Sequence, residues 1–208
     1  MSKESRKKKA ENDKSLRIEN YENHRKGLLE DGYIEKIGTI SIIKANLMSF
    51  ATAGPLAVVA VVLFFLKHKP FSFDISFGAL CLFFLLFIVS IPVHELIHGA
   101  VWGIFCKNKY KSIHLGIMWE QLTPYCHSKE PLSFWRYLAG GLAPLVILGA
   151  GTFIAAYFSG SVMLLCLSIF NILSAGGDTT IAIMLLKYKN AVLLDHPYEC
   201  GFVAFLKP

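Results

Sequence analysis

Residues 91–99 read Ile-Pro-Val-His-Glu-Leu-Ile-His-Gly and lie within one of the most apolar segments of the chain. On a helix, His94 and His98 are four residues apart, so both imidazoles project from the same face. Two nitrogens at this spacing can bind one zinc ion at about 2.0–2.1 Å each. Glu95 can take a proton from a water on the metal without being a ligand itself. The stretch therefore predicts a metal site with His94 and His98 as ligands and Glu95 as the catalytic base.

The alternative is a purely structural role, in which the two histidines only help to pack a helix bundle. Ionisable side chains within a membrane segment are costly and rare unless they have a function, which favours the metal site. Pro92 lies two residues before His94 and cannot donate a backbone hydrogen bond. It would loosen the helix just before the motif, or be an ordinary proline of a membrane helix.

Composition indicates a protein of the cell membrane, plasma or inner, that crosses it several times. Of the 208 residues, 54% are apolar, and they come in long blocks rather than in alternation. The net charge of +6 does not indicate nucleic-acid binding, because the basic residues gather in the N-terminal tail and at segment ends. The five cysteines are scattered without Cys-x-x-Cys spacing, which argues against a disulfide framework and a structural zinc ribbon.

Four apolar segments are long enough to cross a bilayer, which predicts an all-α polytopic membrane protein. The predicted spans are 46–66, 77–105, 137–158 and 162–186, within one membrane domain at 27–189. The polar connection between the second and third spans contains two predicted strands, 112–117 and 121–125, which would form a small β-hairpin. Outside these, the sequence predicts a disordered, charged tail at 1–26 and a short tail at 190–208. Residues 27–44 fit either a strand or an interfacial helix.

The distribution of basic residues predicts the orientation of the four spans. Lys and Arg are frequent in the N-terminal tail and in the 106–136 connection, whereas the 159–161 turn has none. By the positive-inside rule, both termini and the hairpin connection are cytoplasmic. The second span then places the histidines roughly 10–17 Å from its inner end, and the fourth places Asp178 at roughly 12 Å. The matched depths predict one shared site.

A catalytic zinc ion takes three protein ligands and leaves the fourth position open. Asp178 is the one carboxylate besides Glu95 within a predicted span, so it is the predicted third ligand, the alternative being an aspartate that packs between helices. Asn171 lies seven residues earlier and could donate to a substrate carbonyl or oxyanion, or simply join two helices. His114 and His127 of the polar connection are alternative ligands, although loop histidines are more often solvated or hydrogen-bonded.

Several of these elements together resemble a known family. They are the His-Glu-Leu-Ile-His-Gly motif at 94–99, Tyr-Cys-His at 125–127, Ala-Pro at 143–144 and Ser-Ala-Gly-Gly-Asp at 174–178. Over about 27–189 the chain is similar to a bacterial membrane family known as "putative zincin peptidase", itself thought to be distantly similar to the site-2 proteases. Asn171 and Asp178 match in kind the later-helix element of the site-2 proteases, but its prolines and the glycine after the aspartate are missing here.

The resemblance implies zinc-dependent hydrolysis of peptide bonds within the membrane or at its cytoplasmic face. The substrate would be a membrane protein or peptide, with the lipid bilayer as the other partner. A non-catalytic protein that keeps the metal site, or a pathway for metal ions or protons, is the alternative. Glu95 separates the two, because only a hydrolase needs a non-ligand carboxylate at this position. The sequence names no substrate, and it allows a homo-oligomer without requiring one.

Overall fold

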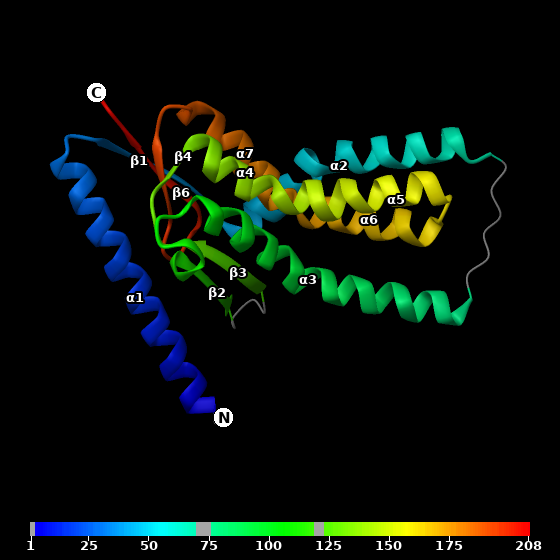
Figure 1. The fold of residues 1–208 in the computed structure, drawn as a ribbon, viewed down its shortest axis with the longest axis horizontal. Coiled ribbons are helices and arrows are strands. Elements are labelled where there is room, and N and C mark those ends of the chain that lie inside the picture. Colours follow the sequence, from blue (N-terminus) through cyan, green and yellow to red (C-terminus); the bar gives the residue numbers. More distant parts are fainter. Residues whose placement is uncertain (1–2, 70–75, 119–122) are drawn as a thin grey trace.

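The structure is a computed structural model that describes residues 3–69, 76–118 and 123–208. It is mostly helical, with a bundle of long apolar helices and, at one end of this bundle, a layer of strands with helix α1 beside it (Figure 1). The α-helices are α1 (Lys3–Glu30), α2 (Ile42–Lys67), α3 (Phe77–Phe105), α4 (Phe134–Pro144), α5 (Gly151–Ser159), α6 (Val162–Ser174) and α7 (Gly176–Leu185). The strands are β1 (Ile34–Ile40), β2 (Ile113–Met118), β3 (Thr123–Ser128), β4 (Leu132–Ser133), β5 (Val192–Asp195) and β6 (Cys200–Leu206).

Three helical segments are long and apolar enough to cross a membrane, which fits a multi-pass membrane protein. They are Ile43–Lys67, Phe77–Phe105 and Phe134–Ser159. The third joins α4 to α5 through a π-helical segment, Leu145–Ala150. A fourth candidate consists of two helices, Val162–Ser174 and Gly176–Tyr188, which are bent by 43° at the break between them. The bundle exposes large apolar side chains along its length, as a surface in contact with lipid would.

The bend differs from the single straight span predicted at 162–186. The break falls at Ala175 and is followed by Gly176 and Gly177, which are poor helix formers. Gly176 also packs directly against α2, where a Cβ added to it would lie 2.7 Å from the Cα of Ser49. The close approach of α2 therefore coincides with the change in direction.

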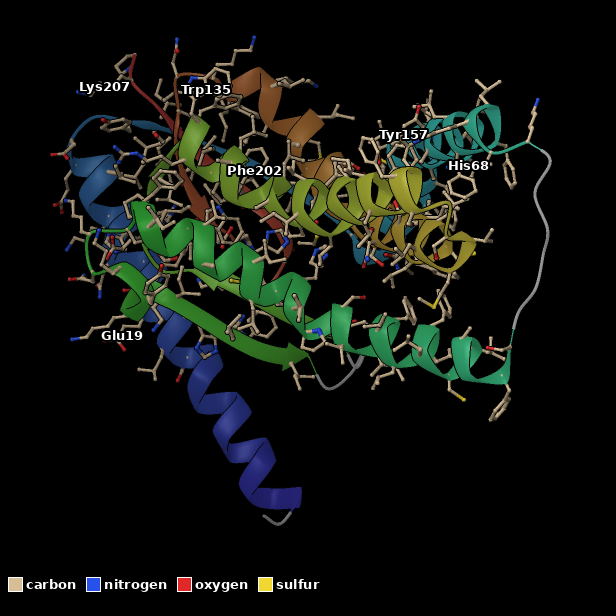
Figure 2. All side chains as sticks on the ribbon, turned by 45° about the vertical axis from the view of Figure 1, so that its right-hand side comes forward. Glu19, His68, Trp135, Tyr157, Phe202 and Lys207 are labelled. Atoms are coloured by element: carbon tan, nitrogen blue, oxygen red, sulfur yellow. The ribbon has the colours of Figure 1, made fainter. Side chains whose placement is uncertain are left out.

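The C-terminal segment is part of a sheet rather than a simple tail. Strands β1, β6, β5 and β4 form a four-stranded antiparallel sheet in that order. Along β6 the side chains alternate: Phe202 and Ala204 pack against the ends of the bundle helices, whereas Val203 and Phe205 pack toward α1. Figure 2 shows Phe202 in this interior, with Trp135 at the same end of the molecule and His68 and Tyr157 at the other.

The predicted disordered tail also differs from the structure, in which residues from Lys3 onward form helix α1. Tyr21 and Leu28 bury themselves against the sheet and give this charged helix an apolar contact. The helix ends in a Schellman motif, in which Tyr33 N donates to Leu28 O at 3.0 Å and Gly32 adopts a positive φ of 83°.

The polar connections contain more strand than the all-α prediction allowed. Of the two structures that the sequence offered for residues 27–44, the strand is the one formed, as β1, ahead of α2. Strands β2 and β3 pair antiparallel between α3 and α4, as a hairpin would, with Ile113 opposite Ser128. The predicted second strand began at residues 121–122, which lie outside the described residues. Which side of the membrane holds this pair stays a prediction.

Candidate metal centre

The three predicted ligands meet where α3 faces the beginning of α7. His94 and His98 lie one turn apart in α3, and Asp178 lies in the first turn of α7. The Nε2 atom of His94 is 3.0 Å from Oδ2 of Asp178, and Nε2 of His98 is 3.4 Å from Oδ1. The two imidazole Nε2 atoms are 3.1 Å apart. The two imidazoles thus each turn their Nε2 atom toward the Asp178 carboxylate, one facing each of its oxygens.

These separations fit a zinc ion. Three atoms that each lie about 2.0–2.1 Å from one ion in tetrahedral geometry are about 3.3–3.4 Å from one another. The donor atoms of His94, His98 and Asp178 all lie within 4.8 Å of one another, and they form the one such group in the described part of the chain. Two imidazoles and a carboxylate are a ligand set of catalytic zinc, which keeps a fourth position open.

The orientation of His98 is fixed by the helix that follows the hairpin. Its Nδ1 donates to the carbonyl oxygen of Gly140 in α4 at 2.8 Å. This hydrogen bond places the proton on Nδ1 and leaves the lone pair of Nε2 facing His94 and Asp178. The side chains of His94, His98 and Asp178 are 12%, 6% and 20% exposed, so the group is largely buried but still partly accessible.

Trp102 forms the wall behind His98. Its indole stacks on the imidazole with ring centroids 5.3 Å apart and an interplanar angle of 19°, and its Nε1 donates to Tyr137 O at 3.0 Å. Gly140 is in contact with the same indole, because a Cβ there would overlap the Trp102 ring. Sequence reasoning missed these partners. Trp102 lies four residues after His98, on the same helical face as the motif, and that spacing could have pointed to it.

Glu95 lies beside the three ligands but outside the ligand group. The backbone N–H of Cys126 in β3 donates to its carboxylate, which also interacts electrostatically with His98, His94 and Asp178. Strand β3 therefore orients the carboxylate that the sequence predicted as a base. Sequence reasoning had not identified this contact, because nothing in the Tyr-Cys-His element indicates a backbone donor.

Asn171 is buried in α6 with 3% of its surface exposed. Its side-chain nitrogen has no hydrogen-bond partner among residues 3–69, 76–118 and 123–208. A buried amide without a partner is costly, so this nitrogen requires an explanation. Asn171 is not a member of the ligand group.

The two alternative ligands, His114 and His127, are also outside the group. They lie opposite each other on β2 and β3. Burial, reinforced by the charge of Arg17, lowers the pKa of His127 to about 3, so this imidazole is neutral at physiological pH. Its Nδ1 lies 3.6 Å from a carboxylate oxygen of Asp195, away from the three predicted ligands.

Asp195 at the end of β5 ties the sheet to the wall behind His98. Its carboxylate accepts hydrogen bonds from the backbone N–H of Ser128, at 2.7 Å, and from the hydroxyl of Tyr137. Burial raises the pKa of Asp195 to about 6. The backbone carbonyl of Tyr137 in turn accepts a hydrogen bond from the indole N–H of Trp102. Hydrogen bonds and stacking thus connect β5, α4 and α3 up to the imidazole of His98.

The fold and the site define a helical membrane protein with a histidine-histidine-aspartate group suited to a metal ion. The model of the family described as "Putative zincin peptidase" matches residues 87–193, and the chain belongs to this family. The match runs from the middle of α3 to β5 and contains His94, Glu95, His98 and Asp178. Neither the curated proteins nor the solved structures include a match to the chain.

The geometry predicts that Asp178 is required for metal binding. Asp178→Ala removes one of three donors and should weaken zinc binding at least tenfold. The loss of a residue that merely hydrogen-bonds to a ligand already costs about tenfold, so the loss of a ligand should cost at least as much. Zinc affinity can be measured by competition with a chromophoric chelator in detergent. Ser174→Ala is the control, because within the described part of the chain its hydroxyl donates only to Phe170 O of its own helix. Equal zinc affinity of wild type and Asp178→Ala would rule Asp178 out as a ligand.

Proposed function

We propose that the protein is a zinc-dependent peptidase that hydrolyses peptide bonds of membrane proteins, within the membrane or at its cytoplasmic face. One observation carries this proposal: the two imidazole Nε2 atoms, 3.1 Å apart, each lie within 3.4 Å of an oxygen of the Asp178 carboxylate, beside a second carboxylate, Glu95, that is not a member of this group. Membership in a family described as zincin peptidases supports the same activity.

His94, His98 and Asp178 would hold the metal. When bound, zinc supplies a Lewis acid for the peptide carbonyl and lowers the pKa of a water in its open position to about 7. Glu95 accepts a proton from the attacking water and passes it to the leaving amine. The Cys126 N–H holds the Glu95 carboxylate in place for both transfers.

Asn171 would bind the substrate. Its unpartnered side-chain nitrogen can donate to a peptide carbonyl oxygen, and the donation strengthens as negative charge develops on that oxygen. This role would explain why α6 keeps a polar amide that the described residues leave unsatisfied. Asn171→Leu should therefore reduce turnover while zinc binding is unchanged.

The position of the site limits the substrate. His98 lies seven residues before the end of α3 at Phe105, which is roughly 10 Å along the helix axis. A substrate must present an extended segment at this depth, since peptide bonds inside a helix are shielded by their own hydrogen bonding. We therefore propose membrane proteins or peptides whose chain unwinds near the cytoplasmic surface as the substrate class.

The proposal predicts that Glu95→Gln separates metal binding from hydrolysis. The amide keeps the size of the side chain but cannot accept the proton, so peptide hydrolysis should fall at least a hundredfold. Zinc content should stay at the wild-type level, because Glu95 is not a member of the ligand group. Cleavage of a membrane-peptide library, read by mass spectrometry, together with elemental analysis, measures both.

His94→Ala serves as the control, since it should lose zinc and hydrolysis together. Wild-type hydrolysis by Glu95→Gln would contradict the mechanism. A zinc-loaded wild type without hydrolysis of any library peptide would favour the alternative of a retained metal site or an ion pathway.

We also propose that both termini lie in the cytoplasm. Basic side chains gather at the end of the bundle that carries the sheet, namely Lys107, Lys109, Lys111, Arg136, Lys187 and Lys189. Trp135, 70% exposed, lies at the same end, as aromatic side chains at a membrane interface do (Figure 2). Basic residues favour the cytoplasmic side.

The orientation predicts the labelling pattern of single cysteines in a background that lacks the native ones. Cysteines at Lys109 and Lys207 should be protected from an impermeant thiol reagent in intact cells, whereas one at Lys69 should react. Permeabilised cells provide the control for reactivity. If cysteines at positions 109 and 69 were labelled from the same side of the membrane, the model of four membrane crossings would be wrong.

A further inference from the structure

The predicted ligand Asp178 lies in the first turn of α7, which packs against α2, a helix that the family match does not include. The match starts at residue 87, whereas α2 ends at Lys67. Resting on the proposed function, we propose that Thr52 of α2 is a positioning residue for the metal site, which holds the first turn of α7 so that Asp178 reaches the ion.

The first observation is the direct contact between the two backbones. A Cβ added to Gly176 would overlap the Cβ of Ser49 and lie 2.7 Å from its Cα. Because a backbone atom cannot move away as a flexible side-chain end can, any side chain at position 176 pushes α7 away from α2. The neighbouring Gly177 has nothing within 4 Å of such an added Cβ. The close approach is therefore specific to one glycine of the pair.

The second observation is a hydroxyl network around the carbonyl oxygen of Gly176. The hydroxyls of Thr179 and Thr180 in α7 lie 2.9 Å and 2.8 Å from that oxygen, and the hydroxyl of Thr52 in α2 lies 3.2 Å from it and 3.1 Å from Met48 O of its own helix. Each hydroxyl has one proton, so each can donate to one of these acceptors at a time. The Thr52 hydroxyl is also 2.8 Å from the hydroxyl of Thr179, which can donate to it instead of to Gly176 O, and 3.2 Å from the hydroxyl of Thr180. Thr179 is 7% exposed and Thr180 is fully buried, so the network is shielded from solvent.

These contacts flank Asp178 on both sides in the sequence. Gly176 precedes it by two residues, and Thr179 and Thr180 follow it directly. Fixing these residues against α2 fixes the backbone of Asp178 between them. The break at Ala175 uncouples the direction of α7 from that of α6, so the contact with α2 takes over this task.

Precise placement matters because the side chain of aspartate is short. Its carboxylate spans the two imidazoles, with one oxygen 3.0 Å from His94 and the other 3.4 Å from His98. A shift of α7 by a fraction of an ångström would lengthen one of these separations. Supporting residues of metal sites contribute to affinity in this way, and their loss typically costs roughly 10–100-fold.

The test compares the zinc affinity of full-length variants in detergent by chelator competition. Thr52→Val keeps the shape of the side chain without its hydroxyl and should raise the Kd for zinc roughly tenfold, and Thr52→Ser should restore affinity to within about twofold of wild type. Gly176→Ala should raise the Kd about tenfold or more. Gly177→Ala is the matched control, because the same methyl group one residue later meets no neighbour.

The melting temperature of the metal-free protein separates positioning from general helix packing. Thr52→Val with unchanged zinc affinity would overturn the inference, whether or not the metal-free protein melts earlier. Visible spectra of the cobalt-substituted proteins should also differ between wild type and Thr52→Val, since the spectrum reports ligand geometry. If Thr52→Val does not fold, equal zinc affinities of Gly176→Ala and Gly177→Ala would overturn the inference instead. A wild type that binds no zinc would overturn the proposed function itself.

Discussion

The structure depends on one constraint: two imidazoles and a carboxylate face one another inside an apolar helix bundle. The two imidazole nitrogens and the carboxylate oxygens lie 3.0–3.4 Å from their nearest partners in this group, an arrangement that could hold a metal ion. An unpaired carboxylate at the centre of a bilayer costs roughly 2.5–3.5 kcal/mol on insertion scales, which binding to a dication offsets. The carbonyl of Gly140 orients His98, and the break between α6 and α7 and the contact of Gly176 with α2 lie just before Asp178.

The sheet outside the bundle supports the site from the other direction. Asp195 in β5 binds Tyr137, the carbonyl of Tyr137 binds Trp102, and Trp102 stacks on His98. Strand β3 meanwhile orients Glu95 through the N–H of Cys126. His98 and Glu95, both in α3, are thus contacted by different neighbours: His98 by α4 and Trp102, and Glu95 by strand β3. Rigid supporting contacts of this kind are what catalytic geometry requires.

The sequence predicted the parts of the site whose signals are local or follow from membrane depth. The spacing of His94 and His98 indicates that they lie on one helical face. Asp178 was predicted because it lies at the same depth in its span as the two histidines. The structure brings the three side chains together. The sheet could not be predicted, because β6 is a short run that is apolar on both faces and shows no alternation. Helix α1 was missed since few apolar residues, such as Tyr21 and Leu28, mark its buried face. Backbone hydrogen-bond partners such as the carbonyl of Gly140 could not be predicted, because a residue of any type can supply a backbone carbonyl.

X-ray absorption at the zinc edge of the purified wild-type protein tests the central claim most directly. A zinc ion held by His94, His98 and Asp178 should show a first shell of nitrogen and oxygen at about 2.0–2.2 Å, with the outer-shell scattering of two imidazoles and without sulfur. If the spectrum of His98→Ala shows the scattering of one imidazole fewer than wild type, the first shell belongs to this site. A sulfur shell at about 2.3 Å, or protein that holds no zinc after zinc has been supplied, would contradict it.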